Sequence, residues 1–276
     1  MRIDAHQHYW LFDSERDAWI NSDMEVIRRN FLPNDISQQL KDRGFDGVVA
    51  VQADQSHRET EFLAELASVY KLIKGVVGWV DLRSPEIETY LKHFGQYEVI
   101  KGFRHIIEGE EDSEFLVRDE FLRGIEALTA NNFTYDLLIR PRHFKSTLAC
   151  VAMNPNQKFM LDHIAKPDIR SGKVGDWFEF IEKLGAHDNV YAKISGLATE
   201  ADWKNWKLED FGKYIAHVIR VFGKKRIVFG SDWPVSLLAA NYDEVLEIAE
   251  AGLSEFSEAE RKAFFGQNAV DFYGLK

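Results

Sequence analysis

The chain has a single cysteine, Cys150, in 276 residues, so it can form no internal disulfide and has no thiol cluster to hold a metal. No apolar run approaches the roughly 18 residues that a membrane-spanning helix needs. The N-terminal residues lack an apolar stretch after a basic patch, which argues against a secretory signal. These absences predict a protein of a reducing, cytoplasmic compartment.

Basic residues are also scarce. The formal net charge is −11, and the longest basic run is Lys224-Lys225-Arg226. A protein that gains affinity by neutralising phosphates needs the opposite balance, so we expect no nucleic acid partner and no membrane partner. A small anionic ligand is not excluded, because one or two local arginines can outweigh a distant surface field. We therefore expect a small-molecule partner, and no pattern indicates an oligomeric state.

Short β-branched or aromatic runs alternate with segments that have helical spacing of apolar residues. Several runs are continuously apolar, as expected for parallel strands covered by helices. This alternation predicts a single (β/α)₈ TIM barrel over residues 1–276, with a long loop insertion from Tyr9 to Pro33 over one mouth. The eight expected strands are Arg2–His6, Gly47–Gln52, Gly75–Val80, Ile100–Arg104, Phe133–Ile139, Lys158–His163, Val190–Ile194 and Arg226–Gly230.

Polar residues follow three of these strands at the barrel end that carries active sites. His6 and His8 are two residues apart, so their imidazoles point the same way along an extended strand. His163 ends the sixth strand, and Asp232 follows the eighth. Three histidines and a carboxylate suit a divalent cation such as zinc. The alternative is a metal-free site in which Asp232 and His163 act as base and polarising donor.

Other residues near these strand ends are candidate substrate ligands. Arg104 and His105 follow the fourth strand, where a guanidinium could bind a carboxylate, carbonyl or hydroxyl. The alternative for Arg104 is an ion pair with an acidic residue such as Glu108. Lys193 lies on the seventh strand and either lines the pocket or belongs to a buried ion pair.

Aromatic and basic residues of the loops extend this set. Trp10, Trp19 and Trp233 lie near the expected mouth, where aromatic faces can stack on a sugar-like ring, although most tryptophans are core residues. Arg140 and Arg142 follow the fifth strand and either reach the pocket or are solvated. We expect His143 to lie on the surface. Four further histidines fall in predicted helices or turns, and we assign them no role: His57, His93, His187 and His217.

Together these residues resemble the amidohydrolase superfamily, whose barrels carry a His-x-His on strand one, a later histidine and a strand-eight aspartate. More narrowly, six motifs look like its sugar-lactonase branch, which includes fuconolactonases, rhamnonolactonases and a metal-independent pyrone-dicarboxylate lactonase. The motifs are Phe31-Leu32-Pro33, Val51-Gln52-Ala53, Lys101-Gly102-Phe103-Arg104-His105, Asp162-His163-Ile164-Ala165-Lys166-Pro167, Lys193-Ile194-Ser195-Gly196 and Phe229-Gly230-Ser231-Asp232-Trp233-Pro234.

The chain departs from the two-metal members of that superfamily. Strand four ends in Arg104 in place of a lysine fit for carbamylation, and strand five offers no histidine before Arg140. Without bridging and second-site ligands, we expect at most one ion, zinc being the best match, and a metal-free site is the alternative.

The resemblance implies hydrolysis of a sugar lactone to the sugar acid. Asp232 would take a proton from water, while His163, with Arg104 or one metal held by His6 and His8, would polarise the carbonyl. Two rivals share these residues: a zinc-dependent decarboxylase of the same superfamily, and a sugar-acid binding barrel without turnover. The sequence identifies neither the sugar nor the ring size.

Overall fold

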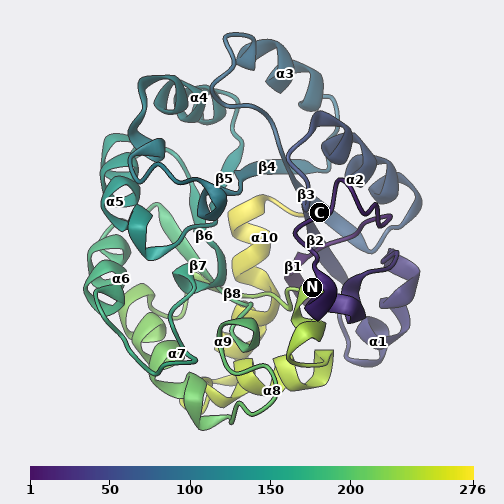
Figure 1. Cartoon of the computed structure of the whole chain (residues 1–276), viewed down its shortest axis with the longest axis vertical. Helices are drawn as coiled ribbons and strands as arrows, with labels where there is room; N and C mark the ends of the chain where they lie inside the picture. Colours follow the sequence, from purple (N-terminus) through teal and green to yellow (C-terminus); the bar gives the residue numbers. More distant parts are fainter.

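Eight parallel strands form a barrel in the computed structural model, which describes residues 1–276 (Figure 1). Neighbouring strands pair in the order β1 to β8. Gln7 bridges Trp233, and the N–H of Asp232 donates to His6 O (2.9 Å), which brings β1 against the segment after β8. The predicted (β/α)₈ barrel is confirmed. The strands are β1 (Ile3–Gln7), β2 (Gly47–Val51), β3 (Ile73–Gly78), β4 (Ile100–His105), β5 (Thr134–Leu137), β6 (Phe159–Leu161), β7 (Val190–Ile194) and β8 (Ile227–Phe229).

Helices follow the strands and surround the barrel (Figure 1). Their apolar faces join the outward-facing strand residues in one large core. The helices are α1 (Ser37–Asp42), α2 (His57–Val69), α3 (Ile87–Phe94), α4 (Asp119–Ala130), α5 (Phe144–Met153), α6 (Trp177–Gly185), α7 (Glu209–Phe222), α8 (Tyr242–Ala251), α9 (Glu258–Lys262) and α10 (Asn268–Tyr273). None of them is both long enough and apolar enough to cross a membrane.

A second, smaller apolar cluster involves α10, which runs across the centre of the ring of helices in Figure 1. Phe272 and Tyr273 of α10 pack with Val49, Val77 and Val228, which come from three different strands. This helix therefore closes the barrel at the end opposite the predicted site.

The segment between β1 and α1 contains a short 3-10 helix, Ser22–Ile27, and folds back on itself. Trp10 pairs with Phe31 in an antiparallel bridge, and their rings meet edge to face. Trp10, Trp19 and Met24 of this segment line the large cavity described below. Its status as an insertion relative to other barrels stays a prediction.

Candidate functional site

The four residues predicted as metal ligands converge at one mouth of the barrel, and all are buried. His6 Nε2 lies 3.1 Å from His8 Nε2. Asp232 Oδ1 lies 3.3 Å from His8 Nε2, 3.7 Å from His6 Nε2 and 3.8 Å from His163 Nε2. Neighbouring ligands of a tetrahedral zinc ion are separated by about 3.3 Å, given zinc–nitrogen bonds of about 2.0 Å. His6, His8 and Asp232 could therefore hold one divalent ion, and His163 lies beside Asp232 at the edge of this group.

Outer contacts orient two of the three imidazoles. His8 Nδ1 lies 2.8 Å from Val51 O, which can only accept, so Nδ1 carries the proton and Nε2 is free. His163 Nδ1 lies 2.9 Å from Ser195 Oγ. Gly196 lies against the same ring, since a Cβ there would lie 2.5 Å from His163 Nδ1. Such contacts to the far nitrogen are the usual way in which a protein fixes a metal-binding histidine.

The backbone that carries His163 has an unusual conformation. β6 ends at Leu161, and the chain then winds left-handed through His163 (φ 52°), Ile164, Ala165 and Lys166. Asp232 also has a positive φ, 58°. Left-handed conformations of residues other than glycine cost about 1–3 kcal/mol each and concentrate at functional sites. The predicted strand Lys158–His163 is therefore too long, because its last residues form this turn.

Burial and mutual proximity set the charges of the cluster. Burial raises the pKa of the Asp232 carboxyl, but the neighbouring His163 and the contact with His8 outweigh this and hold it below its ordinary range. Burial lowers the pKa of His163 to about 4, against the opposing effect of Asp232. Burial, with the adjacent Lys193, also places the pKa of His6 well below its usual value. At neutral pH the His6 and His163 rings are therefore neutral and the Asp232 carboxylate is ionised.

A second set of charged groups lies beneath the cluster inside the barrel. Lys193 is fully buried and donates to Asp136 Oδ2 (2.5 Å) and to His6 Nδ1 (3.1 Å). Its ammonium also lies 2.9 Å from Asp162 Oδ1. Lys193 does not line the cavity, so of the two alternatives the structure places it in a buried ion pair and not in contact with the cavity. No role was predicted for Asp136, within β5, or for Asp162, directly after β6, because their partners come together only when the barrel closes.

Arg104 lines the cavity, and its role as a substrate ligand stays a prediction. Its Nη1 donates to Asp162 Oδ2 (2.9 Å) and its Nη2 to Gln52 O (2.6 Å). The partner of Arg104 is therefore Asp162 and not Glu108. Its Nε is buried without a hydrogen-bond partner, which leaves one guanidinium N–H unused within the protein.

A cavity of about 450 Å³ opens above this cluster. Two predicted substrate ligands do not reach it. His105 is buried, stacks on Phe115 and pairs with Glu110 (2.7 Å). Trp233 is 3 % exposed and packs edge to face on Phe31. The cavity-lining side chains from the barrel floor and the long segment after β1 include His8, Trp10, Trp19, Met24, Arg104, His163 and Asp232.

Charged residues form the outer wall of the same cavity. Glu108 accepts hydrogen bonds from Lys166 (2.8 Å) and Arg140 (3.1 Å), and Arg140 also donates to Glu200 (2.8 Å). Trp203 lies beside them. Of this group the sequence analysis named only Arg140 as a pocket candidate. The other residues lie in loops after separate strands, where no spacing pattern relates them.

Two further predictions concern the loop after β5. Arg142 is exposed, does not line the cavity and donates to the backbone oxygens of Glu108 and Glu110. His143 is fully buried and its Nε2 lies 3.1 Å from Glu110 O. The expectation of a surface position for His143 was wrong, because the loop after β4 covers it.

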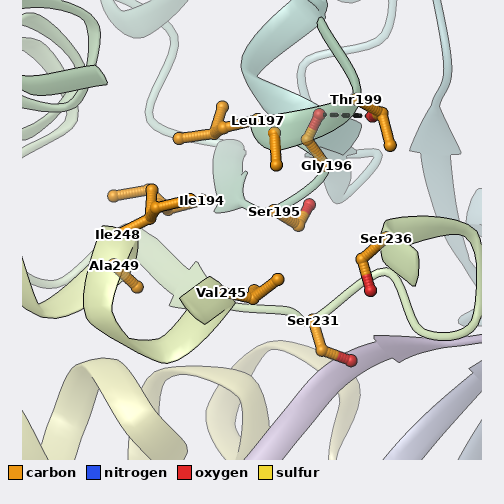
Figure 2. Close-up of a pocket in the computed structure, with 11 residues that line it drawn as sticks. Ile194, Ser195, Gly196, Leu197, Thr199, Ser231, Ser236, Val245, Ile248 and Ala249 are labelled. Carbon is orange, nitrogen blue, oxygen red and sulfur yellow. Dashed lines mark hydrogen bonds between the residues drawn. The ribbon is translucent and has the colours of Figure 1, made fainter. Parts of the chain in front are cut away.

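A second, very small pocket lies behind the site (Figure 2). It holds about 10 Å³ and is lined by the segment Ile194–Thr199, by Ser231 and Ser236, and by residues of α8. Figure 2 shows the bond from Thr199 Oγ1 to Gly196 O (2.9 Å), which fixes the loop that supports His163. The pocket is too small for a metabolite, so the large cavity is the candidate active site.

Comparison with known proteins places this site in a family. The amidohydrolase family model matches residues 3–275. The chain belongs to the amidohydrolase family. An L-fucono-1,5-lactonase of Burkholderia multivorans is 36% identical, over 100% of this chain and 96% of the relative. The crystal structure of an amidohydrolase from Burkholderia multivorans with bound zinc has a TM-score of 0.94 at 35% identity, covering 100% of both chains.

A solved structure with lower sequence identity shares the fold alone. The 5-carboxyvanillate decarboxylase of Novosphingobium aromaticivorans aligns with a TM-score of 0.69 at 16% identity, over 100% of this chain and 96% of that chain. Relatives that share about a third of the residues include a lactonase and an amidohydrolase structure with bound zinc.

Proposed function

We propose that this amidohydrolase hydrolyses a sugar lactone of the aldono-lactone class to the open sugar acid. The observation that carries the proposal is the buried Asp232 carboxylate at the floor of the cavity, whose Oδ1 lies within 3.8 Å of a ring nitrogen of each of His6, His8 and His163. The 36% identity to an L-fucono-1,5-lactonase over the full chain supports a sugar lactone as the substrate.

Asp232 is placed to act as the general base. Its carboxylate takes a proton from a water molecule as that water attacks the lactone carbonyl carbon, and returns the proton to the ring oxygen when the ring opens. The low pKa of Asp232 keeps it ionised but makes it a weak base. An ester suits such a base, because an alkoxide leaves more readily than an amine.

His163 and Arg104 are the candidate donors to the carbonyl oxygen. When the Ser195 hydroxyl donates to His163 Nδ1, the neutral ring carries its proton on Nε2 and can donate to the substrate. Arg104 lines the same cavity and is the second candidate donor. A divalent metal bound by His6, His8, His163 and Asp232 would supply Lewis-acid polarisation and a more acidic water.

The outer wall is suited to a polyhydroxylated ring. Glu108 and Glu200 offer acceptors, and Lys166 and Arg140 offer donors, at the rim of one cavity. Sugar hydroxyls both donate and accept, so they can join this network without leaving a buried charge unpaired. We propose that these four residues read hydroxyl stereochemistry.

The test is hydrolysis of L-fucono-1,5-lactone followed by acid release with a pH indicator. We expect turnover by the native enzyme and a loss of at least about 100-fold in kcat for Asp232→Asn, which keeps the shape but removes the base. Asp168→Asn, at an exposed aspartate outside the cavity, is the matched control and should retain full activity. Unchanged hydrolysis by Asp232→Asn would overturn the mechanism.

Parallel assays distinguish the lactonase from the two alternative functions, the decarboxylase and the non-catalytic barrel. Loss of a chromophoric aromatic acid with release of carbon dioxide, and no acid release from lactones, would replace the lactonase with a decarboxylase. Binding of the sugar acid without turnover of any lactone would indicate the non-catalytic barrel.

A further inference from the structure

His6 differs from the other two histidines of the cluster in the polar groups that lie next to Nδ1, the ring nitrogen on the side away from His8. His6 Nδ1 has two polar neighbours of opposite kind: Lys193 Nζ at 3.1 Å and Asp162 Oδ1 at 3.4 Å. An ammonium can only donate and a carboxylate can only accept. Nδ1 therefore bonds to Lys193 when it is bare and to Asp162 when it carries the proton.

The first arrangement forms a consistent chain of donors. Lys193 donates to His6 Nδ1, so the neutral His6 ring carries its proton on Nε2, which lies 3.1 Å from His8 Nε2. His8 Nδ1 carries the other proton, because it faces Val51 O, so His8 Nε2 accepts from His6. Arg104 Nη1, which can only donate, lies 3.4 Å from His6 Nε2, a contact that favours the other tautomer, but the same nitrogen makes a shorter hydrogen bond of 2.9 Å to Asp162. In this arrangement His6 Nε2 has no lone pair for a metal.

The second arrangement is the one that a metal requires. His6 Nε2 must be bare to ligate an ion, so the ring proton must move to Nδ1. The only acceptor facing Nδ1 is Asp162 Oδ1, which is buried and has no hydrogen bond in the structure, because its 2.9 Å contact with Lys193 lies outside hydrogen-bond geometry. The bond from Lys193 to His6 is lost at the same time.

We propose that Lys193 and Asp162 together set the tautomer of His6, and that Lys193 is a positioning residue that holds the site in its metal-free form. Asp162 stabilises the metal-holding tautomer. The metal affinity of the site is then lower than its ligand set alone would give, because binding breaks the bond between Lys193 and His6.

The tautomer itself is measurable by long-range ¹H–¹⁵N NMR on protein with ¹⁵N-labelled histidine, with His6 assigned from the spectrum of His6→Gln. In metal-free enzyme we expect His6 to be protonated at Nε2, and addition of zinc ions should move the proton to Nδ1. A proton on Nδ1 already in the metal-free enzyme would overturn the proposal.

A second measurement tests the effect of Lys193 on affinity. In Lys193→Met/Asp136→Asn one positive and one negative charge are removed together, so the net charge beneath the cluster is unchanged. We expect this variant to bind zinc at least about tenfold more tightly in competition with a chromogenic chelator, the scale of effect known for outer contacts of metal ligands. Asp136→Asn, which keeps the bond to His6, is the control and should stay within about threefold of the native protein.

Equal or weaker zinc binding by the folded double variant, with its thermal unfolding recorded alongside, would contradict the proposal. If the double variant does not fold, the NMR measurement on the native enzyme decides alone. Neither measurement requires the enzyme to hydrolyse a lactone, so the proposal and the proposed function can fail separately.

Discussion

Glu59 of α2 should make the stability of this protein depend on pH. Its side chain is buried, with Oε1 accepting a hydrogen bond from the N–H of Ala53 (3.0 Å), directly after β2. Burial raises the pKa of Glu59 from 4.5 to about 7, and nearby Asp54 adds to this effect. The folded protein therefore holds this proton more tightly than the unfolded chain does. The contribution of protonated Glu59 to the free energy of unfolding is fully present below pH 4.5 and is lost as the pH rises through about 7.

The magnitude follows from the two pKa values. The difference between 4.5 and about 7 corresponds to about 3 kcal/mol, at roughly 1.4 kcal/mol for each pH unit. Glu59→Gln keeps an oxygen for the Ala53 N–H and cannot ionise. We expect the variant to match the native protein at pH 4 and to exceed its free energy of unfolding by up to about 3 kcal/mol at pH 8.

Urea unfolding of both proteins at a series of pH values measures this difference directly. Glu65→Gln, on the exposed side of the same helix, is the matched control, and its difference from the native protein should not vary with pH. The reasoning is refuted if the Glu59→Gln curve runs parallel to the native curve between pH 4 and 8.

Three further outcomes are expected. Gly196→Ala would place a methyl group 2.5 Å from His163 Nδ1 at a φ of 61°, so kcat/KM should fall at least about tenfold, whereas Gly44→Ala (φ 71°, open space) should lower only the melting temperature. The pH profile of kcat/KM should be flat from about pH 5 to 8, since the pKa of His163 is about 4 and that of Asp232 lies below its usual range; a midpoint near pH 6 would contradict these roles. Tyr273→Phe removes the 2.8 Å hydrogen bond from the Tyr273 hydroxyl to Asp136 and should lower the free energy of unfolding in urea by about 1–3 kcal/mol. An unchanged urea unfolding curve would be the contrary result.

Patterns along single strands predicted the fold well, since each strand carries its own β-branched run and the eight runs alternate with helical segments. The proximity of the candidate metal ligands was also predictable, because strand ends in a parallel barrel meet at one mouth. His6, His8, His163 and Asp232 needed only that rule to be placed together.

Partners across the barrel were not predictable in the same way. Lys193 pairs with Asp136 of β5 and with Asp162, the residue directly after β6, and only closure of the barrel sets these distances. The burial of His105 and Trp233 depends on which loop covers them, and loop packing leaves no periodic signal. The left-handed turn at His163 was missed because its residues are not glycines, the residue type that ordinarily indicates such a backbone.

The position of α10 has a consequence for how the enzyme is made. Tyr273 donates to Asp136, the same carboxylate that holds Lys193 beneath His6, so the floor of the site depends on a side chain that the ribosome adds well after Asp232. α10 follows every candidate ligand in the sequence, so a chain that ends before Asn268 would carry all four ligands but lack both the Tyr273 hydroxyl and the apolar face that covers the barrel bottom. The C-terminal helix is therefore the last part of the chain that the charged interior of the barrel requires.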